Sequence, residues 1–244
     1  MKIIETPSPN HDERTLPITM LVLHYTGMET GDAASIRLRD KNAKVSAHYM
    51  VHEDGQIDRL VQDDKRAWHA GVSYWDGQSN INSASIGVEI VNGGHDFGLP
   101  DFPDTQIKSV IQLCKVLKAK HAISDHNIIG HSDIAPDRKQ DPGEKFPWAR
   151  LADSDVGIWP DIKTSDQTIL FAENDEDAYV KVCQRGLAYL GYGVPFSGIM
   201  DAQTQLVAAA FQRRYRPSKI DGFLDMQTIE ILNLLVKYKK KTTR

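Results

Sequence analysis

The sequence is poor in the features that mark disulfide-rich, membrane-spanning and nucleic-acid-binding proteins. Only two of its 244 residues are cysteine, and the formal net charge is −4. No run of about 18 apolar residues occurs, so no membrane span is predicted. Cys114 and Cys183 fall at apolar positions of expected helices, which favours buried thiols, although the sequence leaves a bridge between them open. We therefore expect a globular protein with no transmembrane segment and no nucleic-acid partner.

The chain also lacks an apolar leader and, in its second half, histidine. Residues 1–7 contain no stretch typical of a secretory signal. We expect a cytoplasmic protein as written, or a periplasmic or cell-envelope protein if a leader has been removed. All nine histidines lie at or before His131, which suggests two segments with different tasks. The length suits one medium domain with a small companion.

Two apolar stretches each lead to a histidine. Residues 17–23 predict a strand buried on both faces, and His24 follows it directly. Residues 127–129 precede His131, which opens a loop rich in Pro and Gly that reaches Asp141. Two neutral imidazoles and one carboxylate would hold a zinc ion with the fourth tetrahedral position open, as in catalytic sites. The alternative is that His131 and Asp141 are solvated loop residues.

Residues 85–92 predict a further strand with a carboxylate inside it. Ile86, Val88 and Ile90 share one face by period-two alternation, and Glu89 points to the other. A carboxylate is costly to bury without a partner. Glu89 is therefore either a paired structural group or part of a site, and we favour the site.

The other elements of the first segment follow from periodicity and turn signals. Residues 46–52 and 56–61 predict a hairpin through Glu53-Asp54-Gly55. Helices are expected at 31–42, anchored by Ile36 and Leu38, and at 105–120. Strands alternating with helices predict an α/β domain with a mixed central sheet flanked by helices. Aromatic residues near the loop 66–71 are either core or suited to sugar rings and peptide stems.

The last third of the chain predicts a small helical domain. Periodicity fades over the acidic span 161–177, which we interpret as a linker. Beyond it, Gly198-Ile199-Met200-Asp201-Ala202-Gln203-Thr204 is repeated 24 positions later from Gly222 to Thr228. Each copy opens a helix, with Asp201 and Asp225 as expected caps. We predict domains at 1–160 and 178–238, the second a three-helix bundle, and a basic tail at 239–244.

These motifs resemble a known family. His24-Tyr25-Thr26, Ser46-Ala47-His48-Tyr49, the run from Arg66 to Gly71, Ser85 to Glu89, and Gly130 to Pro136 are similar to zinc N-acetylmuramoyl-L-alanine amidases of the amidase-2 superfamily, AmiD/AmpD type. The superfamily also includes T7 lysozyme and the peptidoglycan recognition proteins. The segment from Ala178 to Leu235 resembles the peptidoglycan-binding-1 domain.

The resemblance implies roles for individual residues. His24, His131 and Asp141 would be the ligands of one zinc ion per chain, with Asp141 where some relatives have cysteine. Glu89 would be a catalytic glutamate, and Lys139 would stabilise the oxyanion. The residues implied around the substrate groove are Tyr49, Trp68, His69 and Asn92.

The implied activity is hydrolysis of the amide bond between N-acetylmuramic acid and L-alanine, in peptidoglycan or muropeptides, by a monomer. The alternative is a peptidoglycan-recognition protein that binds without cutting. For the helical segment the alternatives are a cell-wall anchor and a stabilising appendage. If it is an anchor, we expect its deletion to weaken wall binding and to spare hydrolysis of small muropeptides.

Overall fold

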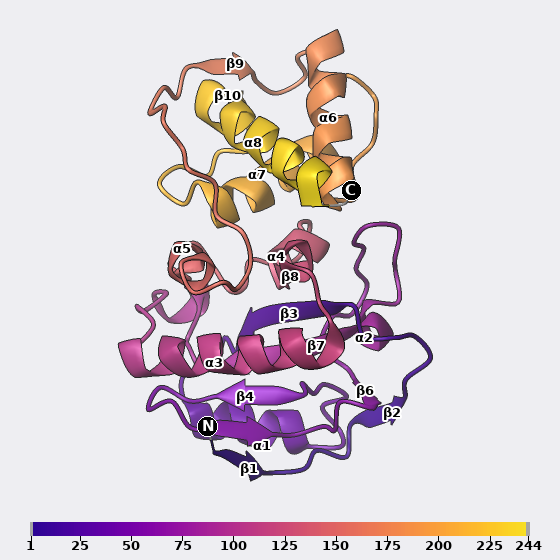
Figure 1. The fold of residues 1–244 in the computed structure, drawn as a ribbon, viewed down its shortest axis with the longest axis vertical. Coiled ribbons are helices and arrows are strands. Elements are labelled where there is room, and N and C mark those ends of the chain that lie inside the picture. The colour runs from indigo at the N-terminus through magenta and orange to yellow at the C-terminus, as the bar shows by residue number, and fades with distance from the viewer. Residues whose placement is uncertain (1, 243–244) are drawn as a thin grey trace. The chain divides into compact units, whose positions relative to one another are not determined.

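The structure, a computed structural model, describes residues 2–242, which form two compact units (Figure 1). The sheet unit comprises the chain up to Ser73, Asn80–His131 and Asp141–Ile158. The helical unit comprises Tyr74–Ser79, Ser132–Gln140 and the chain from Trp159 onward. The second unit thus takes up two loops from inside the segment 1–160, which the sequence treats as one domain.

A six-stranded mixed sheet is the centre of the sheet unit, as predicted (Figure 1). Its strand order is β1-β5-β4-β7-β3-β8. The pairs β4–β7, β7–β3, β3–β8 and β1–β5 are parallel, and β4 and β5 form the predicted antiparallel hairpin. The bounds are β1 Ile3–Glu5, β3 Met20–Tyr25, β4 Tyr49–Val51, β5 Ile57–Arg59, β7 Ser85–Ile90 and β8 Ile128–Gly130.

Helices and a small ribbon surround this sheet. The helices are α1 Gly31–Arg39, α2 Ile81–Ala84, α3 Asp104–His121 and α5 Trp148–Ala152, with short 3-10 turns η1 His95–Phe97 and η2 Asp125–Asn127. The antiparallel ribbon pairs β2 His11–Glu13 with β6 Lys65–Ala67. Helix α4, His131–Ile134, begins in the sheet unit and continues into the helical unit. Figure 1 shows α3 running along the sheet.

The buried strands follow the apolar pattern, whereas one of the two expected anchors of the first helix does not. Leu21, Val22 and Leu23 in β3 are fully buried, because parallel strands are covered on both faces. In α1, Leu38 is buried as expected, whereas Ile36 is 69% exposed. The prediction for Ile36 was wrong because α1 buries a narrow stripe, Ala34 and Leu38, four residues apart on one face.

Three helices form most of the helical unit, as the sequence predicts. They are α6 Ala178–Leu190, α7 Ala202–Tyr215 and α8 Met226–Thr242. The Asp201 carboxylate accepts from the amide of Thr204 at 2.8 Å, and Asp225 accepts from that of Thr228 at 2.8 Å. Both expected caps are confirmed. The span 161–177 is not a bare linker, because it includes β9 Ile169–Phe171, which pairs with β10 Leu224–Asp225.

A buried glutamine supports each copy of the repeat. Gln184 accepts from the amide of Gly198 and donates to the hydroxyl of Thr204. Gln212 makes the matching bonds, to Gly222 and Thr228. The duplication therefore includes the supporting glutamine as well as the turn. The sequence analysis did not predict this, because both glutamines lie outside the repeated seven-residue segments.

Both cysteines are free and buried, which resolves the question left by the sequence. Burial raises the pKa of the Cys114 thiol to about 12. Among residues 2–242, no helix has both the length and the apolar character needed to cross a membrane.

Candidate metal centre

The parallel pairing of β3 and β8 brings two of the predicted residues to one edge of the sheet. Leu23 pairs with Gly130, so the next residues, His24 and His131, lie side by side where these strands end. Both imidazoles are buried. Asp141 joins them at the end of the loop that follows α4, and this residue is 6% exposed.

Three side-chain atoms form a triangle at this edge. The Nδ1 atoms of His24 and His131 lie 2.9 Å apart, and the Asp141 Oδ2 lies 2.9 Å from the first and 3.0 Å from the second. Within residues 2–242, this is the only group of three or more potential metal ligands so spaced. Zinc bonds to such atoms measure about 2.0–2.2 Å, so one ion can contact all three.

The outer nitrogens of both imidazoles are already used. The His24 Nε2 lies 3.0 Å from the His69 Nδ1, and the His131 Nε2 lies 3.1 Å from the carbonyl oxygen of Ala70. We assign the ring hydrogen of His131 to Nε2, because a carbonyl can only accept. The Ser85 hydroxyl donates to the carbonyl of Ile81 and therefore accepts from the His69 Nε2, which leaves the His69 Nδ1 to accept from the His24 Nε2. Both Nδ1 atoms then face the Asp141 carboxylate as acceptors, an arrangement suited to a cation among them. The residues present therefore fit a metal ion.

Residues 69–70 thus orient both histidines from one segment, and neighbouring residues hold that segment. The Asn82 side-chain oxygen accepts from the amides of His69 and Ala70, at 2.9 and 2.7 Å. The His69 Nε2 lies 3.2 Å from the Ser85 hydroxyl. A Cβ at Gly87 would come within 2.4 Å of the His69 ring, so only glycine leaves room for it.

Charge and burial set the protonation of this centre. Burial raises the pKa of Asp141, but when the neighbouring His131 and His24 rings are protonated, their charge and hydrogen bonds outweigh burial and hold that pKa well below its usual range. Burial, together with the imidazoles of His24 and His48, lowers the pKa of His69 well below its ordinary value. His69 is therefore neutral and serves as an acceptor for His24.

The predicted catalytic glutamate lies on the neighbouring strand. Glu89 pairs with His24 in the parallel register of β7 and β3, so the two side chains leave the same face of the sheet. Glu89 is 9% exposed. Lys139 lies in the loop between His131 and Asp141, where its amide donates to the carbonyl of Ala135 at 3.0 Å, and its side chain is half-buried.

Two of the predicted groove residues occupy places that favour structural roles. Tyr49 pairs with Val88, so it points to the opposite face of the sheet from Glu89, and its hydroxyl donates to Asp63 at 2.7 Å. His69 is buried beneath His24. For these two residues the geometry favours positioning over contact with substrate.

The other two predicted groove residues differ from each other. Asn92 bonds to the carbonyl of Pro100 and the amide of Gly94, and it thereby shapes the loop after β7. Trp68 is half-buried. Its amide donates to the Ser46 hydroxyl at 2.9 Å, which anchors its backbone.

Sequence reasoning missed a chain of polar groups beside the candidate metal ligands. The Tyr25 hydroxyl lies 2.9 Å from the His95 Nδ1, and the His95 Nε2 lies 3.0 Å from Glu144. Burial and the nearby Asp141 carboxylate raise the pKa of Tyr25, so its hydroxyl stays protonated. The position of Tyr25 directly after His24 was the one available signal.

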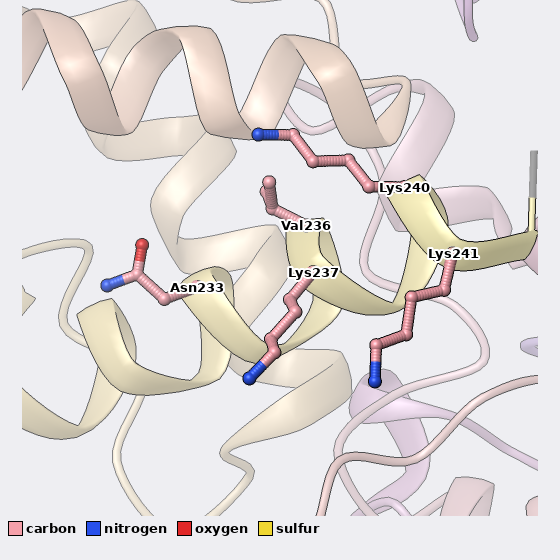
Figure 2. Close-up of a pocket in the computed structure, with 5 residues that line it drawn as sticks. All are labelled: Asn233, Val236, Lys237, Lys240 and Lys241. Carbon is pink, nitrogen blue, oxygen red and sulfur yellow. The ribbon is translucent and has the colours of Figure 1, made fainter.

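A separate hollow lies along the last turns of α8 in the helical unit (Figure 2). Figure 2 shows Lys237 and Lys241 pointing to the same side of the helix, with Lys240 turned away from them. Asn233 and Val236 complete its lining. It contains none of the residues predicted for the metal centre, and solvated lysines on one helix do not by themselves make a site.

Comparisons with known proteins give the family of each segment. A family model described as N-acetylmuramoyl-L-alanine amidase matches residues 14–144, and one described as a putative peptidoglycan binding domain matches residues 176–232. The N-acetylmuramoyl-L-alanine amidase AmiD of Escherichia coli is 34% identical, covering 91% of this chain and 83% of its own. The 1,6-anhydro-N-acetylmuramyl-L-alanine amidase AmpD of Enterobacter cloacae is 35% identical, over 59% of this chain and 86% of its own.

Solved structures extend the likeness to the fold. E. coli AmiD, in complex with anhydro-N-acetylmuramic acid-L-Ala-D-γ-Glu-L-Lys, superposes with a TM-score of 0.78 at 33% identity, covering 91% of this chain and 89% of that one. AmpDh3 from Pseudomonas aeruginosa gives a TM-score of 0.77 at 30% identity, covering 96% and 95%. The chain therefore belongs to the N-acetylmuramoyl-L-alanine amidase family, and it pairs the amidase segment with a peptidoglycan-binding one.

Proposed function

We propose that this protein is a zinc-dependent amidase that hydrolyses the bond between N-acetylmuramic acid and L-alanine in peptidoglycan or muropeptides. The observation that carries the proposal is the buried triangle of His24, His131 and Asp141, whose lone pairs converge on one point. Membership of the amidase family gives the reaction class. The muropeptides held by the related AmiD and AmpDh3 structures support the substrate class.

Three side chains would hold the zinc ion: His24, His131 and Asp141, one ion per chain. When bound, the ion supplies Lewis acidity, which acidifies water and polarises a carbonyl oxygen. The surrounding protein contributes the orientation of both imidazoles through His69 and Ala70, so the ligands need little rearrangement on binding.

Glu89 and Lys139 would move and stabilise charge. Glu89 leaves the same sheet face as His24, which suits it to accept the proton of the attacking water and to pass it to the departing amine of L-alanine. Lys139 would stabilise the negative charge that develops on the lactyl carbonyl oxygen. Among the predicted groove residues, the half-buried Trp68 would stack against the substrate, and Asn92 would shape the loop beside it.

The helical unit is proposed to bind peptidoglycan, which the match to a putative peptidoglycan binding domain supports. A sedimentation assay with purified cell walls tests this proposal. It compares the amount of full-length protein bound to the wall with and without excess soluble muropeptide. Retention on the wall that soluble muropeptide cannot displace supports a second binding surface; complete displacement argues against it. Size-exclusion chromatography with light scattering tests the predicted monomer.

The decisive experiment for the reaction is incubation of the zinc-loaded protein with a muramyl peptide. Release of a peptide with a free N-terminal L-alanine, abolished by a chelator and restored by zinc, supports the amidase. Intact substrate after long incubation, together with measurable binding, would support the non-catalytic recognition protein instead.

A further inference from the structure

Asp133, a buried aspartate in the loop after His131, contacts two buried side chains of the helical segment. Asp133 is 1% exposed, and its two carboxylate oxygens have different partners. The Arg214 Nη1 donates to one at 2.7 Å, and the Tyr192 hydroxyl donates to the other at 2.7 Å. Arg214 belongs to α7, and Tyr192 follows α6. The side chains of Arg214 and Tyr192 are themselves buried, at 3% and 2% exposed.

Further contacts in the helical unit surround this group. The Trp75 ring packs edge-on against Tyr192, with centroids 4.9 Å apart. The amide of Asp76 donates to the carbonyl of Gly191 at 2.8 Å, and the amide of Tyr74 donates to that of Ile134 at 2.9 Å. The loops 74–79 and 132–140 are therefore fixed to each other and to the α6–α7 connection.

The loop 132–140 has a special place in the chain. It begins directly after His131, ends directly before Asp141 and contains Lys139. Its conformation therefore sets how two of the three proposed metal ligands approach each other. A misplacement of about 1 Å, caused by a change far from the reacting atoms, lowers rates by roughly 10²-fold in enzymes.

We propose that Arg214 and Tyr192 are positioning residues for the metal centre: through Asp133 they hold the loop between His131 and Asp141 in the shape that metal binding and Lys139 require. This inference rests on the proposed zinc amidase function. It also revises the expectation that the helical segment is dispensable for hydrolysis, because its removal would leave the Asp133 carboxylate without its cation.

A matched control lies two residues further along. Arg216 is 2% exposed and pairs with the fully buried Asp225 at 2.9 Å. That pair joins the end of α7 to the start of α8 and does not involve the loop 132–140. Arg214→Met and Arg216→Met thus remove the same guanidinium from equally buried ion pairs, and only the first touches the loop.

The experiment compares these two full-length variants with the wild type in three measurements. These are the zinc dissociation constant from chelator competition, hydrogen exchange in peptides covering 132–140, and kcat/KM on a soluble muropeptide. Arg214→Met should weaken zinc binding about tenfold, speed exchange in the loop at least about tenfold, and lower kcat/KM by roughly 10–100-fold. Arg216→Met should lower the melting temperature but leave zinc affinity, loop exchange and kcat/KM near their wild-type values.

Two further variants keep the test decisive if Arg214→Met does not fold. Tyr192→Phe keeps the ring that packs against Trp75 and removes only the hydroxyl bond, so it should shift the three readouts in the same direction by less. Arg214→Lys keeps the charge and should recover part of the loss. Wild-type zinc affinity and loop exchange in folded Arg214→Met or Tyr192→Phe would overturn the inference. If the wild type itself cleaves no muropeptide, the proposed function fails, whereas zinc affinity and loop exchange still decide this inference.

Discussion

Two buried aspartates, eight positions apart on one stretch of chain, have opposite surroundings. Asp133 is neutralised by the protein itself, through the guanidinium of Arg214 and the hydroxyl of Tyr192. Asp141 faces two imidazoles whose hydrogens we assign to the far nitrogens. A buried carboxylate paired with an internal cation destabilises the fold when that cation is removed, and one that faces neutral imidazoles is suited to bind a cation from solution. The difference favours a structural role for Asp133 and a ligand role for Asp141.

A third buried carboxylate gives the largest expected effect. Glu89→Gln should lower turnover by roughly 10²–10⁴-fold, because the amide cannot accept a proton from water. Zinc affinity should stay near that of the wild type, since Glu89 is not in the triangle of ligands. Zinc stoichiometry and kcat, measured on the same preparation, check both parts. Loss of zinc from this variant would make Glu89 a ligand instead.

The comparison itself is tested by neutralising each aspartate. Asp141→Asn should weaken zinc binding by more than the roughly 10–100-fold typical of outer-shell changes. Asp133→Asn should weaken zinc binding by only about tenfold, as expected for Arg214→Met, and should also reduce the free energy of unfolding by about 3–5 kcal/mol, because the Arg214 cation then lacks its counter-charge. Chelator competition and denaturant titration of both variants separate the two effects. Equal zinc loss in the two variants would erase the distinction.

Loss of the hydrogen bond between His69 and His24 should have a smaller effect on zinc affinity. His69→Phe keeps a ring beneath His24 but removes the acceptor for its Nε2 hydrogen. We expect zinc affinity to fall by about 10–100-fold. Ser85→Ala is the matched control, because Ser85 contacts His69 and not His24; it should lower zinc affinity less. Unchanged zinc affinity with a raised KM would instead favour the groove contact that the sequence analysis predicted for His69.

The smallest expected effect concerns acid stability. Burial, with the nearby charge of Arg14, lowers the pKa of His48 from 6.5 to about 3. The unfolded chain binds a proton at His48 below pH 6.5, and the folded chain does not until about pH 3. Stability is therefore lost as the pH falls through this window, by about 1.4 kcal/mol per pH unit from this residue. His48→Gln should flatten the slope of unfolding free energy between pH 6 and 4; an unchanged slope would assign it to other groups.

The sequence predicted the sheet and the convergence of His24, His131 and Asp141, because strand ends and their order limit where side chains meet. It could not place Tyr49, since one position of register decides between the two faces of a strand. The partners of Asp133 lie in a different part of the chain, and no local pattern links them. The prediction that Ile36 is buried was wrong for a related reason, because a nine-residue helix has too few turns to define its buried face.

Gly87 has a consequence that reaches beyond its own strand. Gly87 lies in a buried strand, and the His69 ring occupies the space that a side chain at position 87 would fill. One added methyl group at this place would tilt that ring and, through it, the first ligand. Affinity for the proposed zinc ion would thus depend on a residue in the sheet interior, even with every proposed ligand unchanged.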